Sequence, residues 1–277
     1  MTVFIVLAVT SLVAATVNGA IGYGYSSISV PVALLVVVSR VLNPALVVIE
    51  VVINLYALVW NRRAARAVLA RVLPLLAGLV PGVIAGALLL DYIAPGTVKL
   101  IAYVALLPLI VLQASGQRWP IRRERTAALP FGVGVGLLYG LTTISGPPLA
   151  LFWNNQGLAK AEFKVTLAVV RSVESVCALI AYAALGLLTW DSASILPWIV
   201  PGVAIGFPFG HWLIQHVGPE TFRRACMSFD AYLVSFGLSR VLADAGIPGL
   251  VAYQALVVTT AIDTILLWRY FRRVQIS

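Results

Sequence analysis

Two short stretches rich in glycine, serine and proline interrupt the apolar sequence and decide its fold. They read Asn18-Gly-Ala-Ile-Gly-Tyr-Gly-Tyr-Ser-Ser27 and Thr142-Thr-Ile-Ser-Gly-Pro-Pro148, and they lie within the regions 2–38 and 127–153. Glycine permits backbone conformations that other residues resist, and proline presets the start of a helix. Each region therefore predicts two short helices around a break.

The composition places these breaks in a membrane protein. Of the 277 residues, 61% are hydrophobic and only 10% are charged, whereas soluble domains carry about 25% charged residues. These figures exclude a soluble globular enzyme, a disordered chain, a coiled coil and a collagen, and they predict an all-α polytopic membrane protein. Unwound backbone at membrane depth survives only inside protein or beside a water-filled cavity, so we expect both breaks in the interior.

The basic residues indicate the topology rather than a nucleic-acid partner. The net charge is +9, and the arginines cluster between apolar runs, as the positive-inside rule describes for cytoplasmic loops. The basic residues obey this rule best if each broken region is a hairpin that returns to the side of the membrane from which it entered. Such a hairpin is either re-entrant or spans the membrane twice. We then expect a multi-pass protein of the cell inner (plasma) membrane with a cytoplasmic C-terminus. The apolar runs long enough to span a bilayer are 44–61, 72–92, 97–114, 164–187, 194–215, 220–241 and 249–268.

Similar motifs recur in the same order in the two halves. Pro31-Val-Ala-Leu-Leu resembles Pro148-Leu-Ala-Leu-Phe, and Val80-Pro-Gly-Val83 recurs as Val200-Pro-Gly-Val203. Each half would hold one broken hairpin and three spans, and because three is odd the halves would be inverted repeats, a plan of secondary transporters. We expect a first repeat over residues 1–114, a basic cytoplasmic linker over 115–126, a second, inverted repeat over 127–241, and an extra helix with a basic cytoplasmic tail over 242–277.

The breaks carry groups that suit a small anion. A helix that starts near Ser26 or Pro148 points free N–H groups and a partial positive charge toward the centre of the protein. Hydroxyl and amide side chains stand in the same stretches, namely Asn18, Ser26, Ser27, Thr142, Thr143 and Ser145. The alternative is that the breaks are kinks that serve only close helix packing.

Arg171 is the second candidate for anion binding, because an arginine within an apolar run faces a partner or a cavity. It lies inside the predicted span 164–187. Its guanidinium group would add a cation to the breaks, or it would form an ion pair with Glu174, one turn away on the same helix face. Asn54, which aligns with Arg171 in the repeat, would offer a neutral contact from the other half.

Acidic residues within apolar runs are candidates for carrying a coupling proton. They are Glu50, Glu174 and Asp230, and we expect His211 and Asp263 to be buried as well. Each is otherwise a helix-packing group. The chain has no Cys/His metal spacing, no phosphate-binding loop and no nucleophile elbow, so we expect no metal, no cofactor and no catalytic residues. The expected partners are a small anionic substrate and the lipid bilayer, with a homodimer as a further option.

The same segments resemble a known family. The stretch 18–27 together with Pro31-Val-Ala-Leu-Leu is similar to the first-half signature of the TauE/SafE family of membrane permeases, the sulfite exporter group. Gly140-Leu-Thr-Thr-Ile-Ser-Gly-Pro-Pro-Leu, followed by Phe163-Lys-Val-Thr-Leu-Ala, resembles the second-half signature. The resemblance covers nearly the whole chain and implies export, or uptake, of sulfite, organosulfonates such as sulfoacetate, or related small anions. Tyr23 and Tyr25 interrupt the first stretch, which is richer in glycine in the family.

We therefore predict a secondary transporter of a small sulfur-containing oxyanion, with two repeats that rock against each other around a midplane site. The residues expected to bind the substrate are Asn18, Gly22, Tyr25, Ser26, Ser27, Asn54, Thr143, Ser145, Gly146 and Arg171. The alternatives are an anion channel and an intramembrane lipid-phosphate phosphatase, which would need carboxylates with a nucleophile or base near the breaks.

Overall fold

The computed structural model describes residues 2–60, 62–115, 121–158, 160–216 and 219–276, and this part of the chain forms helices and no strand. The first half contains α1 (Thr2–Ile21), α2 (Tyr25–Ala33), α3 (Ser39–Trp60), α4 (Arg62–Tyr92) and α5 (Pro95–Ser115). The second half contains α6 (Glu124–Thr142), α7 (Gly146–Asn155), α8 (Lys160–Ala184), α9 (Trp190–Ser194), α10 (Leu196–His216) and α11 (Pro219–Asp244). The last helices are α12 (Gly249–Ala252) and α13 (Gln254–Ile276). The all-α prediction is confirmed.

Seven helices of the described chain are long and apolar enough to cross a membrane. The segments are Val3–Ile21, Ser39–Val59, Ala64–Tyr92, Pro95–Leu112, Glu162–Ala184, Leu196–His216 and Gly249–Arg269, the last of which runs over α12 into α13. The protein is therefore a multi-pass membrane protein. The predicted span 220–241 is not among them, although α11 has 26 residues, because polar residues such as Asp230 and Arg240 interrupt its apolar sequence.

The two broken regions differ from the prediction in their lengths. α1 continues through Asn18 to Ile21 and is long enough to span by itself, whereas α2 has only nine residues. In the second region α6 has 19 residues and α7 has 10. The breaks shrink to residues 22–24 and 143–145. The predicted linker 115–126 is also shorter, because α6 begins at Glu124, and its residues 116–120 lie outside the described chain.

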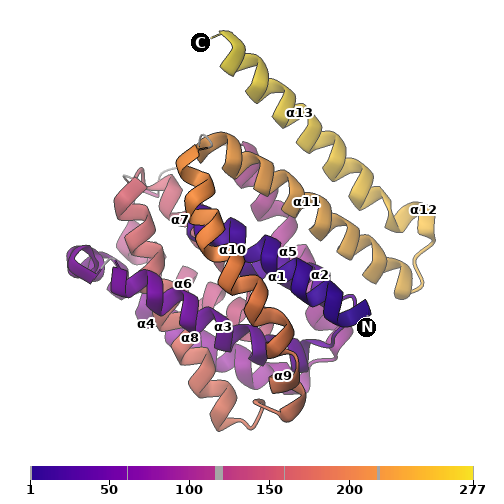
Figure 1. Ribbon diagram of the computed structural model, residues 1–277, viewed down its shortest axis with the longest axis horizontal. Coiled ribbons are helices and arrows are strands. Elements are labelled where there is room, and N and C mark those ends of the chain that lie inside the picture. The colour runs from indigo at the N-terminus through magenta and orange to yellow at the C-terminus, as the bar shows by residue number, and fades with distance from the viewer. Residues whose placement is uncertain (1, 61, 116–120, 159, 217–218, 277) are drawn as a thin grey trace.

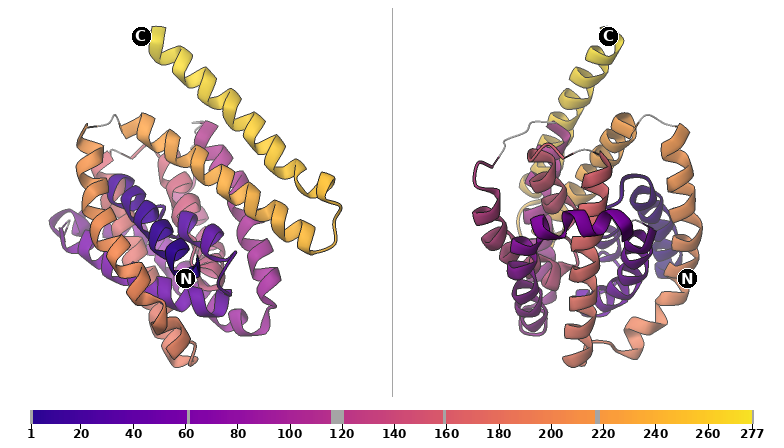
Figure 2. Two further views of the ribbon diagram at one scale, coloured as in Figure 1. Left: turned by 45° about the vertical axis from the view of Figure 1, so that its right-hand side comes forward. Right: turned by 90° about the vertical axis from the view of Figure 1, so that its left-hand side faces the viewer.

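Helices of the two halves pair with each other. α1 lies along α10 and α4 along α6, while α3 packs on α8 and α5 on α11 (Figure 1). α13 contacts α11, α12 and α5 and extends away from the rest of the bundle (Figure 2). In the repeat, α1 corresponds to α6 and α4 corresponds to α10. Exchange of the two halves therefore converts the α1–α10 pair into the α6–α4 pair, as a twofold repeat requires. The inverted orientation of the halves stays a prediction.

Glycines bring these cross-half pairs into backbone contact. The glycines at the contacts are Gly78, Gly82 and Gly86 of α4, Gly132, Gly136 and Gly140 of α6, and Gly202, Gly206 and Gly210 of α10. A Cβ on Gly136 would stand 2.3 Å from the backbone oxygen of Leu79, and one on Gly206 would stand 2.4 Å from that of Leu12. Lipid tails are as apolar as side chains, so helices in a membrane associate through close packing, which small residues permit.

Arg71 joins three helices near one end of the bundle. Its Nε and Nη2 donate to Glu124 of α6 at 2.7 and 2.8 Å, and its Nη1 donates to Glu162 of α8 at 3.0 Å. Both glutamates lie in the first turn of their helices. The chain therefore enters α6 and enters α8 at the same end of the bundle, so α6 and α7 form a hairpin. This agrees with a hairpin in the second region, and the absence of a net membrane crossing stays a prediction.

We expect Gly136→Ala to destabilise the protein and Gly134→Ala, on the same helix, to leave it unchanged. The methyl group at 136 would overlap backbone atoms of α4, and overpacking of this kind costs about 1–3 kcal/mol. A Cβ at 134 would meet nothing within 4 Å. Thermal unfolding of both variants in detergent measures the difference, and equal midpoints would contradict the role of close packing at residue 136.

Arg71→Gln should destabilise the protein more than Arg40→Gln. Arg71 makes a two-point contact with Glu124 and has 33% of its side chain exposed, whereas the Arg40–Asp91 pair is 3.6 Å apart with side chains 45% and 62% exposed. Exposed pairs contribute little, so we expect a loss of about 1 kcal/mol for Arg71 and close to none for Arg40. Chemical denaturation in detergent provides the comparison, and a larger loss for Arg40 would overturn the expectation.

Candidate functional site

The two breaks lie in contact inside the bundle. Gly22 and Gly24 have φ angles of 85° and 102°, and Thr143 has a φ angle of 59°. These left-handed conformations turn the chain between two helices, and threonine seldom adopts them, so the surrounding packing must hold Thr143 in place. A Cβ on Gly146 would stand 3.3 Å from the ring of Tyr23 and 3.4 Å from the backbone nitrogen of Gly24. The starts of α2 and α7 therefore meet.

The two helix starts differ in their backbone donors. Neither helix receives a side-chain hydrogen bond from the residue that precedes it. The first N–H groups of a helix have no partner within that helix, so α2 offers those of residues 25–27. The start of α7 holds Pro147 and Pro148, which lack an N–H group, and offers that of Gly146. The start of α7 is thus poorer in donors than predicted, and α2 is the stronger end for an anion.

An ion pair between Arg171 and Glu50 joins the two halves beside the breaks. Arg171 Nη2 lies 2.7 Å from Glu50 Oε1, and the two side chains are 1% and 0% exposed. The same carboxylate accepts hydrogen bonds from Ser26 Oγ at 2.9 Å and from the hydroxyl of Tyr139 at 2.6 Å. A buried ion pair is stable only when additional donors satisfy its remaining lone pairs. Four helices, α2, α3, α6 and α8, therefore meet at one carboxylate.

Glu174 is bonded to the second break and not to Arg171, although it lies one turn further along α8. Its Oε2 accepts from Ser145 Oγ at 2.5 Å, and its Oε1 has no partner. Arg171 likewise keeps Nε and Nη1 without a partner. The ion pair that helix spacing suggested is replaced by one across the halves. Unpaired buried donors cost free energy, so the two guanidinium nitrogens mark a place for an acceptor.

Asn54 holds α3 against α8. Its Nδ2 lies 3.3 Å from both the backbone oxygen of Arg171 and Ser175 Oγ, and its own backbone oxygen accepts from Ser172 Oγ at 3.0 Å. The repeat alignment, which matches Asn54 with Arg171, thus relates two residues that touch. The amide nitrogen is engaged with protein, so Asn54 positions the helices that carry Arg171 and Glu50.

The other predicted ligands are buried, but their polar atoms point in several directions. Asn18 Nδ2 is buried without a partner. Gly22 and Gly146 contribute backbone alone. Three further hydroxyls bond locally or toward α1: Ser27 Oγ donates to the Gly24 oxygen, Tyr25 OH contacts Ser11 Oγ, and Thr143 Oγ1 donates to the Thr142 oxygen. Among the predicted side chains, those of Ser26, Ser145 and Arg171 reach the two buried glutamates.

The remaining ionisable candidates have different surroundings. Asp230 of α11 is 1% exposed, and neither of its carboxylate oxygens has a partner, although Ser27 lies near it. His211 is exposed, which contradicts the prediction, because the neighbouring Gly210 occupies the face of α10 that packs on α1. Asp263 is partly buried and accepts from Ser228 Oγ at 2.9 Å. Within the described ranges, no three His, Cys, Asp or Glu side chains converge on a metal site.

Residues outside the predicted set complete the surroundings of the second break. Asn43 Nδ2 donates to the backbone oxygen of Leu141 at 2.7 Å, and the hydroxyl of Tyr182 donates to that of Gly140 at 2.7 Å. The last carbonyl groups of a helix lack partners within it, so these two side chains satisfy the end of α6. Together with Tyr139 they could have been found as polar side chains inside apolar runs.

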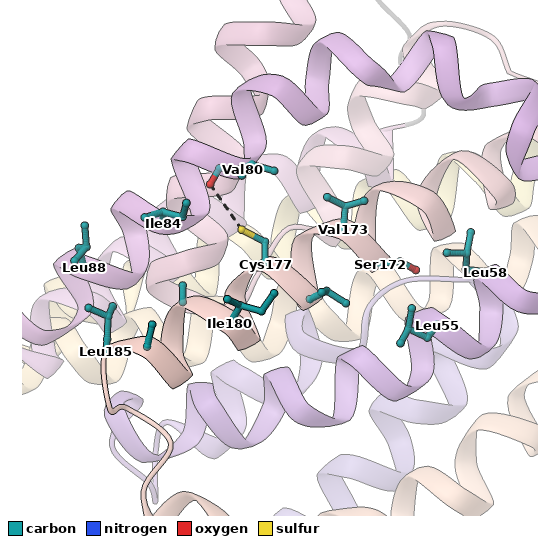
Figure 3. Close-up of a pocket in the computed structure, with 13 residues that line it drawn as sticks. Leu55, Leu58, Val80, Ile84, Leu88, Ser172, Val173, Cys177, Ile180 and Leu185 are labelled. Atoms are coloured by element: carbon teal, nitrogen blue, oxygen red, sulfur yellow. Dashed lines mark hydrogen bonds between the residues drawn. The ribbon is translucent and has the colours of Figure 1, made fainter.

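An apolar cavity nearby does not suit an anion. It has a volume of about 620 Å³ and lies between α3, α4 and α8 (Figure 3). Apolar side chains line it, apart from Ser172 and Cys177, whose Sγ lies 3.9 Å from the backbone oxygen of Val80. None of the lining residues is charged. The candidate site is therefore the cluster of polar groups at the breaks.

Comparison with known proteins identifies the family. A family model described as sulfite exporter TauE/SafE matches residues 7–236. No curated protein and no solved structure matches the chain. The matched range contains both breaks, the Arg171–Glu50 pair and Glu174, and it ends within α11. Because the match covers most of the chain, the protein belongs to the TauE/SafE sulfite exporter family.

Proposed function

We propose that this protein is a secondary transporter of a small sulfur-containing oxyanion, such as sulfite or an organosulfonate like sulfoacetate, in the cell inner membrane. Its family supports a permease for sulfur compounds and argues against an enzyme. The observation that carries the proposal is the buried guanidinium group of Arg171, whose Nε and Nη1 lack partners beside the meeting breaks. A guanidinium group with free nitrogens is suited to forked contacts with an oxyanion.

The substrate would bind between Arg171 and the start of α2. The N–H groups of residues 25–27 and the partial positive charge of the helix end would face the oxyanion from one side, and the guanidinium group would face it from another. The hydroxyls of Ser26 and Ser145 can turn from the glutamates toward the substrate, and Asn18 Nδ2 is a further donor without a partner. The remaining predicted ligands, Gly22, Tyr25, Ser27, Asn54, Thr143 and Gly146, would shape the breaks that hold these donors.

The glycine-packed pairs define the units that would move in alternating access. α1 with α10, and α4 with α6, each join a helix of the first half to a helix of the second at backbone contact. Rocking of one half against the other would separate both pairs. Each pair would instead move as a unit, with α1–α10 shifting relative to α4–α6. Arg171 would stay with α4–α6, because α8 packs on α4.

The proposed orientation places the C-terminus in the cytoplasm. The helix starts that Arg71 joins would lie on the same side, because loops rich in arginine stay in the cytoplasm. Saturable flux in liposomes would distinguish the transporter from the anion-channel alternative.

We expect the double variant Arg171→Met/Glu50→Gln to fold and to lose anion binding. Arg171→Met alone would leave the buried Glu50 carboxylate without its cation, which costs about 3–5 kcal/mol. Glutamine keeps an acceptor for Ser26 and Tyr139 without a charge. A ligand that binds the folded protein raises its unfolding temperature, so thermal shifts of the purified protein with sulfite, sulfate, sulfoacetate and taurine measure binding.

The matched control is Arg40→Met/Asp91→Asn, which removes an exposed pair of the same type. It should keep the thermal shift of the wild type. A folded Arg171→Met/Glu50→Gln protein with the wild-type shift would contradict the role of Arg171. A wild-type protein that responds to none of these anions would contradict the proposed substrate class.

A further inference from the structure

Two glutamates hold the hydroxyl donors at the breaks. Ser26, in the first turn of α2, donates to Glu50 at 2.9 Å, and Ser145, directly before α7, donates to Glu174 at 2.5 Å. A substrate anion that uses these hydroxyls must compete with a carboxylate for each of them. The substrate and the two glutamates therefore share one set of donors.

The charge of this cluster also opposes a further anion. With both glutamates ionised, two buried carboxylates and one guanidinium group leave a net negative charge beside the breaks. Like charges in a desolvated site repel strongly. An anion can join the cluster at low cost only if one carboxylate loses its charge, and a proton from solvent removes it.

Of the two glutamates, Glu174 is the one that its surroundings support less as an anion. Glu50 has a guanidinium nitrogen at 2.7 Å and two hydroxyl donors. Glu174 has one hydroxyl donor and one oxygen without a partner. A protonated carboxyl group is itself a hydrogen-bond donor. Protonation would therefore convert Glu174 from a competitor of the substrate into a ligand for it.

We propose that Glu174 takes up one proton from solvent when the substrate anion binds, so that each anion is carried together with one proton. This inference rests on the proposed function, because it concerns the same site. Among the candidates for the coupling proton, Glu50, Glu174 and Asp230, it selects Glu174, because Glu174 holds a hydroxyl at the breaks, that of Ser145, and lacks the cation that Glu50 has.

The groups that face Glu174 come from several helices. On α8 itself they are Arg171 and Cys177, on α3 Glu50, on α6 Tyr139, and before α7 the hydroxyl of Ser145. Although α4 packs on α8, no titratable group of its described residues is among those that act on Glu174. Arg171 is the one cation in the set, and it already contacts Glu50 at 2.7 Å. Asp230 lies near Ser27 on another side of the first break.

Calorimetric titration of the purified full chain in detergent tests the proposal. The probes are sulfate and sulfoacetate, which keep a constant charge between about pH 6 and 8.5. Titration in two buffers with different protonation enthalpies counts the protons that accompany binding. At pH values where Glu174 is ionised in the free protein, we expect uptake of about one proton per bound anion. Over the same pH values the affinity for the anion should fall by up to about tenfold for each unit that the pH rises.

Glu174→Gln imitates the protonated carboxyl group and keeps an acceptor for Ser145. It should bind the same anion without proton uptake, and its affinity should vary less than about twofold over the same range. The matched control is Asp263→Asn, which removes a partly buried carboxylate of α13 that bonds Ser228. It should keep the proton uptake of the wild type.

Wild-type binding without proton uptake would overturn the inference and leave the proposed transporter in place. Proton uptake that persists in Glu174→Gln and disappears in Asp230→Asn would also overturn it, because Asp230 would then carry the proton. Absence of wild-type binding at every pH would contradict the proposed function and the inference with it. If Glu174→Gln does not fold, the wild type and Asp230→Asn decide: a count of zero in the wild type, or loss of the uptake in Asp230→Asn, would overturn the inference, and uptake retained in Asp230→Asn would support it.

Discussion

The contact between Arg171 of α8 and Glu50 of α3 is the interaction on which the interior of this protein depends. A buried ion pair persists only where further hydrogen bonds complete it, and Ser26 of α2 and Tyr139 of α6 supply them. Both donors come from helices that border a break. The pair therefore ties the breaks to α3 and α8, and it leaves two guanidinium nitrogens of Arg171 without a partner at that place.

Close packing of helices from opposite halves makes this contact possible. The glycines of α4, α6 and α10 bring backbones together where any larger residue would overlap a carbonyl oxygen. In a bilayer such packing replaces the hydrophobic effect as the force that associates helices. The same contacts restrict motion, since a unit held by backbone contact moves as one body. In the proposed mechanism the moving units are therefore these packed pairs and not the two halves of the sequence.

The anion site that we propose at the breaks already contains two carboxylates, those of Glu50 and Glu174. Both serines at the helix starts are bonded to glutamates, and prolines remove backbone donors from the start of α7. A rigid cradle of free donors would bind an oxyanion regardless of protonation. Here the hydroxyl donors are shared with carboxylates, so a bound anion would compete with the ionised glutamates, and proton uptake would relieve that competition. In the proposed transporter, this sharing would couple the movement of an anion to a proton gradient.

The sequence by itself determined a helical membrane protein with two breaks, because apolar content, glycine and proline act locally along the chain. It also located Arg171, Glu50 and Glu174, since charged residues stand out within apolar runs. It could not determine which glutamate pairs with Arg171, because helix spacing relates only residues of one helix and favoured Glu174. It also placed His211 in the interior, whereas the packed face of α10 is the one with Gly210. Only the tertiary structure decided these points, because the partner of a buried charge depends on which helices pack together across the two halves.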